Sequence, residues 1–170
     1  MINIRLGQWE TNSSSCHQIV INKGTYKIPE KITIRTGEYG WEFNVYRDIE
    51  SRMSYLVSVL MGGFSNKEEE FDRYYKMLKD FLYESGVKEV IDPKPDKNGS
   101  DFWSMFNVHH YKGYVDHADW YLGRVTDIIE DREKLYDYLF SGKSYFYTDN
   151  DNRYEDEIPD IESLTEGEEW

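Results

Sequence analysis

Residues 45–63 read VYRDIESRMSYLVSVLMGG, and their apolar side chains recur with the spacing of an α-helix. Positions i, i+4, i+7, i+8 and i+11 of this stretch are apolar and share one helical face. They are Ile49, Met53, Leu56, Val57 and Leu60. The pattern predicts a helix from Val45 to Leu60. Gly62-Gly63 predicts where the helix stops, because glycine is favoured just beyond a helix C-terminus.

A second helix is predicted directly after the first. Ser65 is a good N-cap residue, and Glu68 three positions later completes a capping box. Gly86 stands where a C-terminal glycine belongs. The predicted buried stripe of this helix consists of Phe71, Tyr74, Tyr75, Leu78, Phe81 and Leu82. A third helix is predicted from Asp127 to Phe140, before Gly142.

Short apolar segments around these helices predict strands. The segments are 2–6, 18–22, 31–35, 87–91 and 144–148. Gly7 to His17 is polar and rich in small residues, so it is predicted to be a loop. Early strands, two adjacent helices and mixed late elements predict the α+β class. We expect a single compact domain over residues 1–152, with a mixed or antiparallel sheet and about three helices. An acidic C-terminal segment follows at 153–170, and its apolar residues could anchor it partly on the domain.

Composition excludes several classes of protein. No apolar run approaches the ~20 residues that a membrane span needs, so we expect no membrane partner. Cys16 is the single cysteine, which excludes a disulfide within one chain and favours a reducing compartment. The first residues lack the apolar core of a signal peptide. We therefore expect a cytoplasmic protein.

The net charge of -13 is concentrated at the end of the chain. From Asp149 to Trp170 there are ten acidic residues and one base, Arg153, so this stretch carries -9 and residues 1–148 carry -4. Such a field repels nucleic acid and attracts basic surfaces, so we expect a basic protein partner and no direct binding to nucleic acid. An ordinary solvated tail is the alternative. The candidate partner-binding residues are Glu155, Asp156, Glu157, Asp160, Glu162, Glu166, Glu168 and Glu169.

A polar run near the start of the chain is a candidate ligand-binding segment. It consists of Thr11, Asn12, Ser13, Ser14 and Ser15, followed by Cys16 and His17. Hydroxyls, an amide and backbone N–H groups could cradle a phosphate. A serine or cysteine beside a histidine could also form a nucleophile and its base. A hydrogen-bonded turn is the simpler alternative, because Thr, Asn and Ser favour such turns.

Three of the four histidines lie between His109 and Asp119, together with Asp116. Imidazole and carboxylate are common metal ligands, but the spacing matches no metal motif, and we expect neither a metal nor a cofactor. Histidine and aspartate can also do acid–base work. A joint catalytic site of His17, Asp116 and His117 is one hypothesis, and it requires a fold that brings the two segments together. A structural role is the alternative.

Three segments together resemble a group of small proteins encoded by bacteriophages and mobile elements of low-GC Gram-positive bacteria. They are ETNSSSCH at 10–17, GEYGWE at 37–42 before the helix that carries SYL at 54–56, and GYVDH at 113–117. They cover about a fifth of the chain. The group more often has Thr or Ser where Cys16 stands, which argues against a cysteine nucleophile. The resemblance implies the cytoplasm of a host bacterium, and it favours a shared site of the serine-rich loop with Asp116 and His117.

Two functions stay open on this basis. The first is a phage-type acidic binding protein that inhibits a host defence factor, such as a nuclease, by presenting carboxylates to a groove built for phosphates. The second is a small enzyme or nucleotide- or phosphate-binding protein, in which residues 11–17 hold phosphate and His17 or His117 acts as the base beside Asp116. We favour the first, in which the protein is a nucleic-acid mimic and not an enzyme. The oligomeric state is left open.

Overall fold

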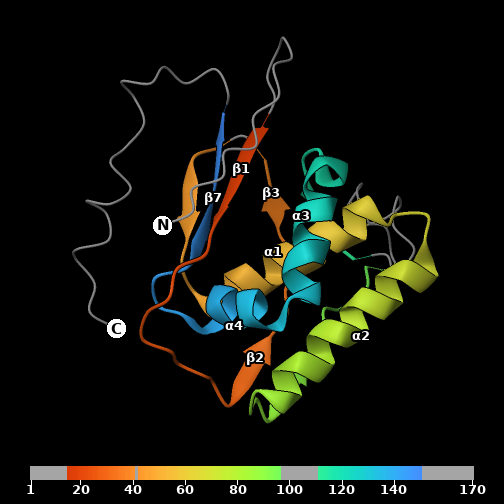
Figure 1. Cartoon of the computed structure of the whole chain (residues 1–170). Coiled ribbons are helices and arrows are strands. Elements are labelled where there is room, and N and C mark those ends of the chain that lie inside the picture. Colours follow the sequence, from red (N-terminus) through yellow and green to blue (C-terminus); the bar gives the residue numbers. More distant parts are fainter. Residues whose placement is uncertain (1–14, 41, 97–110, 151–170) are drawn as a thin grey trace, which may run out of the picture.

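The structure is a computed structural model, and it describes residues 15–40, 42–96 and 111–150 (Figure 1). Within these ranges, small sheets and helices α1 to α4 form a single compact α+β domain, as the sequence predicts. Helix α1 (Ile49–Gly63) lies at its centre. Every residue of α1 from Arg52 to Met61 is buried, so other elements cover this helix on all sides and not only on its apolar face.

The ends of α1 differ from the prediction. Val45 belongs to strand β4 (Asn44–Tyr46), and the helix begins only at Ile49. Asp48 is the N-cap, and its carboxylate accepts a hydrogen bond of 2.7 Å from the Ser51 N–H. Gly62 and Gly63 form the last turn of the helix and do not follow it.

Helix α2 (Glu68–Glu84) buries most of the predicted stripe. The buried residues are Phe71, Tyr74, Leu78, Phe81 and Leu82, while Tyr75 is partly buried. The predicted capping box is wrong: Lys67 occupies the N-cap position without a side-chain hydrogen bond. Ser65 instead belongs to the turn after α1, where its N–H donates to the Gly62 carbonyl (3.4 Å). Gly86 has a φ of 107°, which explains the glycine after the helix.

The single helix predicted over 127–140 is wrong, because two helices occupy this region. Helix α3 (Ala118–Glu130) begins well before the predicted start, and α4 (Arg132–Phe140) follows it. The residue between them, Asp131, is extended (φ -99°, ψ 102°). Its carboxylate accepts a hydrogen bond of 3.1 Å from the Lys134 N–H, so it ends one helix and caps the next.

The strands of the described ranges form three small sheets. The largest is antiparallel, in the order β1-β7-β4, and two parallel pairs, β2·β5 and β3·β6, lie apart from it. The remaining bounds are β1 (Ser15–Val20), β2 (Lys31–Thr33), β3 (Glu38–Tyr39), β5 (Glu89–Ile91), β6 (Tyr114–Val115) and β7 (Tyr145–Asn150). The loop predicted to extend through His17 is wrong for residues 15–17, which are part of β1. The strand predicted at 2–6, most of that loop and the acidic segment 153–170 lie outside the described residues.

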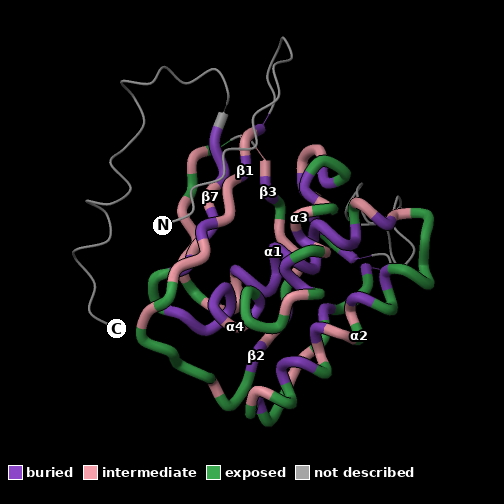
Figure 2. The backbone as a smooth tube through the Cα atoms, in the orientation of Figure 1, coloured by how far each residue is buried: buried purple, intermediate pink, exposed green. Residues whose placement is uncertain are grey.

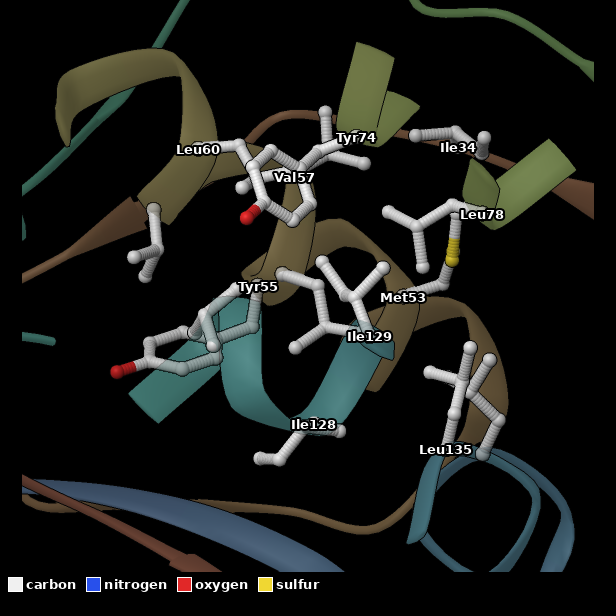
Figure 3. Close-up of a cluster of buried hydrophobic side chains, with 14 of the residues drawn as sticks. Ile34, Met53, Tyr55, Val57, Leu60, Tyr74, Leu78, Ile128, Ile129 and Leu135 are labelled. Carbon is white, nitrogen blue, oxygen red and sulfur yellow. The ribbon is translucent and has the colours of Figure 1, made fainter. Parts of the chain in front are cut away.

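The core joins α1, α2, α3 and α4. Figure 2 shows buried residues along α1, with the exposed positions gathered on the outer elements. Figure 3 shows side chains such as Met53 of α1, Leu78 of α2 and Ile129 of α3 in one cluster. On the sheet side, aromatic rings fill the interior. The Phe146 ring stacks on the rings of Tyr55 and Tyr46, with centroid separations of 4.2 and 4.4 Å. None of the helices in the described ranges is long and apolar enough to cross a membrane.

A buried cation ties α1 to the end of α4. Arg52 is only 2% exposed. Its Nη1 atom lies 2.6, 2.8 and 2.9 Å from the carbonyl oxygens of Tyr138, Ser141 and Ser144. Carbonyls at the C-terminal end of a helix carry partial negative charge, so they solvate the guanidinium group in place of water.

Candidate functional site

His17 has a defined tautomer at the centre of the candidate site. Its imidazole is almost fully buried. Nε2 lies 3.2 Å from the Gly40 carbonyl oxygen, and Nδ1 lies 3.2 Å from the Tyr55 hydroxyl. A carbonyl can only accept, so Nε2 carries the proton and Nδ1 accepts a hydrogen bond from Tyr55. Both ring nitrogens are therefore engaged in the fold.

Burial lowers the pKa of His17 to about 4. The hydrogen bond to the Gly40 carbonyl and the charge of Asp116 oppose this shift, and His117 adds to it. His17 is thus neutral at physiological pH. Asp116 reaches this region through the backbone, because its N–H donates to the Tyr39 carbonyl, which directly precedes the Gly40 that His17 binds. Within the described residues, no hydrogen bond joins Asp116 or His117 to His17 itself.

Tyr121 of α3 attaches the helix to β1. Its ring stacks on the His17 imidazole, with centroids 4.7 Å apart and planes 10° apart. Its hydroxyl accepts a hydrogen bond from the His17 N–H (3.2 Å) and donates one to the Ser15 carbonyl (3.0 Å). Sequence reasoning missed Tyr121. The spacing of Tyr121, Val125 and Ile128 could have revealed a buried helical face, but not its contact with β1.

Described residues from three segments, 15–17, 37–40 and 113–117, meet around His17. Gly40 comes from the second segment and Tyr55 from helix α1, and both bind the imidazole. The third segment joins them through β6, which pairs with β3 so that Tyr39 stands opposite Val115. The Asp116 N–H continues this pairing with a hydrogen bond of 3.0 Å to the Tyr39 carbonyl. In Figure 1, β1, β3 and α3 accordingly lie together.

Asp116 and His117 form the turn that leads into α3. His117 has φ 53° and ψ 41°, the left-handed conformation that few residues other than glycine adopt. Its Nε2 atom lies 3.7 Å from Asp116 Oδ1, and both side chains are about one-third exposed. The imidazole also stacks on the Trp120 indole, with centroids 4.0 Å apart and planes 9° apart.

An open hollow of about 470 Å³ lies beside this turn. Its lining comes from the last turn of α1, Ser65 and residues 113–119. Part of the wall is backbone, because Gly62, Gly63 and Gly113 contribute no side chain. Gly113 has a φ of 90°, and a Cβ atom there would lie 2.4 Å from the Gly37 carbonyl oxygen. Only glycine therefore fits at this position.

The predicted residues that the structure describes are Ser15, His17, Asp116 and His117. His17 is buried in the framework and binds the Gly40 carbonyl, whereas Asp116 and His117 line the hollow. Ser15 is buried in β1. No group of three metal-ligating side chains occurs among the described residues. Thr11, Asn12, Ser13, Ser14 and the candidate acidic residues from Glu155 to Glu169 lie outside them.

Comparisons with protein-family models, with curated proteins and with solved structures found no match to this chain.

Proposed function

We propose that the protein is an acidic binding protein of phage type, which acts in the host cytoplasm and inhibits a basic host defence factor such as a nuclease. The observation that carries the proposal is the uneven charge of the chain. The net charge is -13, and ten acidic residues fall between Asp149 and Trp170. Carboxylates at such density can occupy a groove that normally binds phosphates, and complementary charge speeds association.

Ion pairs within the domain support this reading. Seven lysine or arginine side chains of the described ranges already pair with carboxylates of the same ranges. Examples are Lys79 with Asp92 and Lys134 with Asp131. These seven bases already have carboxylate partners within the domain. This favours terminal carboxylates that pair with another protein instead of with the domain.

A retention experiment tests this function. The full chain, immobilised in low salt, should retain a basic protein from a bacterial lysate and lower that protein's activity on nucleic acid. A variant with Glu155, Asp156, Glu157 and Asp160 changed to their amides should lose most of this retention. The matched control neutralises four acids of α2, E68Q, E69Q, E70Q and D72N, and should keep it. Equal retention by both variants would contradict the terminal segment as the binding surface.

A small enzyme or phosphate-binding protein is the second candidate. The observation in its favour is the hollow beside the Asp116–His117 pair, because a concave site with converging polar groups is the usual setting for ligand binding. The variant H117A separates the two functions. It should disable an enzyme that uses the imidazole, whereas an inhibitor that works mainly through its terminal charge should still retain most of its basic partner.

A further inference from the structure

We propose that the hollow lined by the last turn of α1 and residues 113–119 binds a guanidinium group, as presented by an arginine side chain of the protein partner. The inference rests on the proposed binding function, because it names the chemical group that the partner contributes. It adds a second recognition site, on the folded domain and apart from the terminal segment.

The hollow is preformed, because tight packing fixes its walls. A Cβ atom on Gly62 would lie 2.6 Å from the Cβ atom of Ala118, so α1 and α3 are already in close contact. On the other side, Gly113 lies against the backbone of Gly37. A ligand therefore meets an existing recess of about 470 Å³, which is within the size range of small-molecule sites.

The carboxylates in the lining give the hollow an acidic character. Asp116 and Asp119 belong to its lining, which contains no lysine or arginine. No lysine or arginine of the described ranges forms an ion pair with either carboxylate. Asp119 is exposed and Asp116 is one-third exposed, so both are accessible to a cation in solution. A guanidinium group can bind a carboxylate through two parallel hydrogen bonds.

An exposed aromatic ring that stacks on one of the lining residues favours arginine over lysine. Trp120 is 46% exposed, and its indole is held parallel to the imidazole of His117, which lines the hollow. Planar guanidinium groups stack on such rings, whereas an ammonium group is a compact and strongly hydrated charge.

An anion is the competing occupant, because the N-terminus of α3 opens at the hollow and carries partial positive charge. Two carboxylates oppose an anion there. Asp119 occupies the first turn of α3, and Asp116 lies just before the helix. An incoming phosphate would meet both negative charges, so the lining selects against it.

The test is an NMR titration of the full ¹⁵N-labelled chain with a capped Gly-Arg-Gly peptide. We expect saturable shifts of the amides of Gly62, Gly63 and Gly113 and of the Trp120 indole N–H. The same peptide with citrulline keeps the shape without the charge and should bind about tenfold more weakly. The lysine peptide should also bind more weakly than the arginine peptide.

Substitutions localise the effect. The double variant D116N and D119N should lose about tenfold in affinity for the arginine peptide. The matched control D127N changes an exposed carboxylate of the same helix outside the hollow and should bind as the parent does. If the double variant does not fold, the exposed single change D119N is measured against the same control. Absence of shifts at the hollow, equal binding of citrulline, or stronger binding of inorganic phosphate would each overturn the proposal.

The two proposals fail in different ways. A basic partner retained by the chain, with no arginine binding in the hollow, would end this inference and leave the proposed function standing. Arginine binding in the hollow without any retained partner would leave the guanidinium site standing and would contradict the proposed function.

Discussion

At the scale of single residues, two buried polar side chains define the interior. His17 accepts from Tyr55 and donates to Gly40, so its ring links β1, α1 and the segment after β3. Arg52 donates hydrogen bonds to carbonyl oxygens at the end of α4. Both ring nitrogens of His17, and Nε and Nη1 of Arg52, have hydrogen-bond partners inside the fold, which lowers the cost of burying these groups. For His17 the arrangement suits only the neutral form, and this has a measurable consequence.

We expect the stability of the protein to fall with decreasing pH because of His17. Its pKa is about 4 in the folded state and about 6.5 in the unfolded chain. Its contribution is fully present above pH 6.5 and is lost as the pH falls toward 4, because the unfolded chain then binds the proton more readily. The loss should approach about 3 kcal/mol in the free energy of unfolding.

Urea unfolding of the parent and of H17Q at pH 7 and pH 4 measures this contribution. Glutamine can still donate to Gly40 and accept from Tyr55, yet it does not titrate, so H17Q should lose about 3 kcal/mol less than the parent between the two pH values. Both proteins contain the same carboxylates, so the pH dependence that these groups cause cancels in the comparison. An NMR titration that gave His17 a pKa near 6.5 would contradict the prediction.

At the scale of elements, the contact between α1 and α3 shapes both the core and the hollow. Gly62 and Gly63 lie in the last turn of α1 and face Ala118 and Leu122 of α3. The missing side chains let the two helices approach, and this approach positions the turn at Asp116 and His117. The glycines thus have a packing role in addition to the helix-ending role that their sequence position suggests.

We expect G62A to destabilise the fold by about 1–3 kcal/mol through overpacking, although alanine is the better helix former. Its new Cβ atom would lie 2.6 Å from that of Ala118. The control G123A, on α3, meets nothing within 4 Å and should instead gain up to about 1 kcal/mol. The free energy of unfolding in urea is the readout, and the change A118G should rescue G62A. A G62A protein as stable as the parent would refute the close contact.

At the scale of the whole molecule, charge and shape are divided between different parts. The aromatic α+β domain contains the hollow and most of the basic residues, whereas the excess of acid lies toward the end of the chain. Long-range attraction would bring a basic partner close, and the hollow would then engage one of its arginines.

This division predicts that salt acts mainly on association. The Debye length shrinks from about 30 Å at 0.01 M to about 8 Å at 0.15 M ionic strength. The association rate constant of the complex should therefore fall by about tenfold or more over this range, as measured by surface plasmon resonance or stopped flow. The terminal variant described above should show a much weaker dependence, and a rate unaffected by salt in the parent would rule out steering by charge.

The amino-acid sequence by itself determined the α+β class, the core stripes of α1 and α2 and the distribution of charge. These follow from composition and from spacing along the chain, where neighbours three or four residues apart decide the outcome. Local rules failed where helices begin or end: they put a cap at Ser65 and joined two helices across Asp131.

Only the tertiary structure decided the character of the candidate site. His17 is neutral because the fold buries it against Tyr121, 104 positions away in the chain. The hollow exists because α1, β6 and α3 meet through glycines. Burial and concavity arise from contacts between distant segments, and spacing along one chain carries no information about such distances.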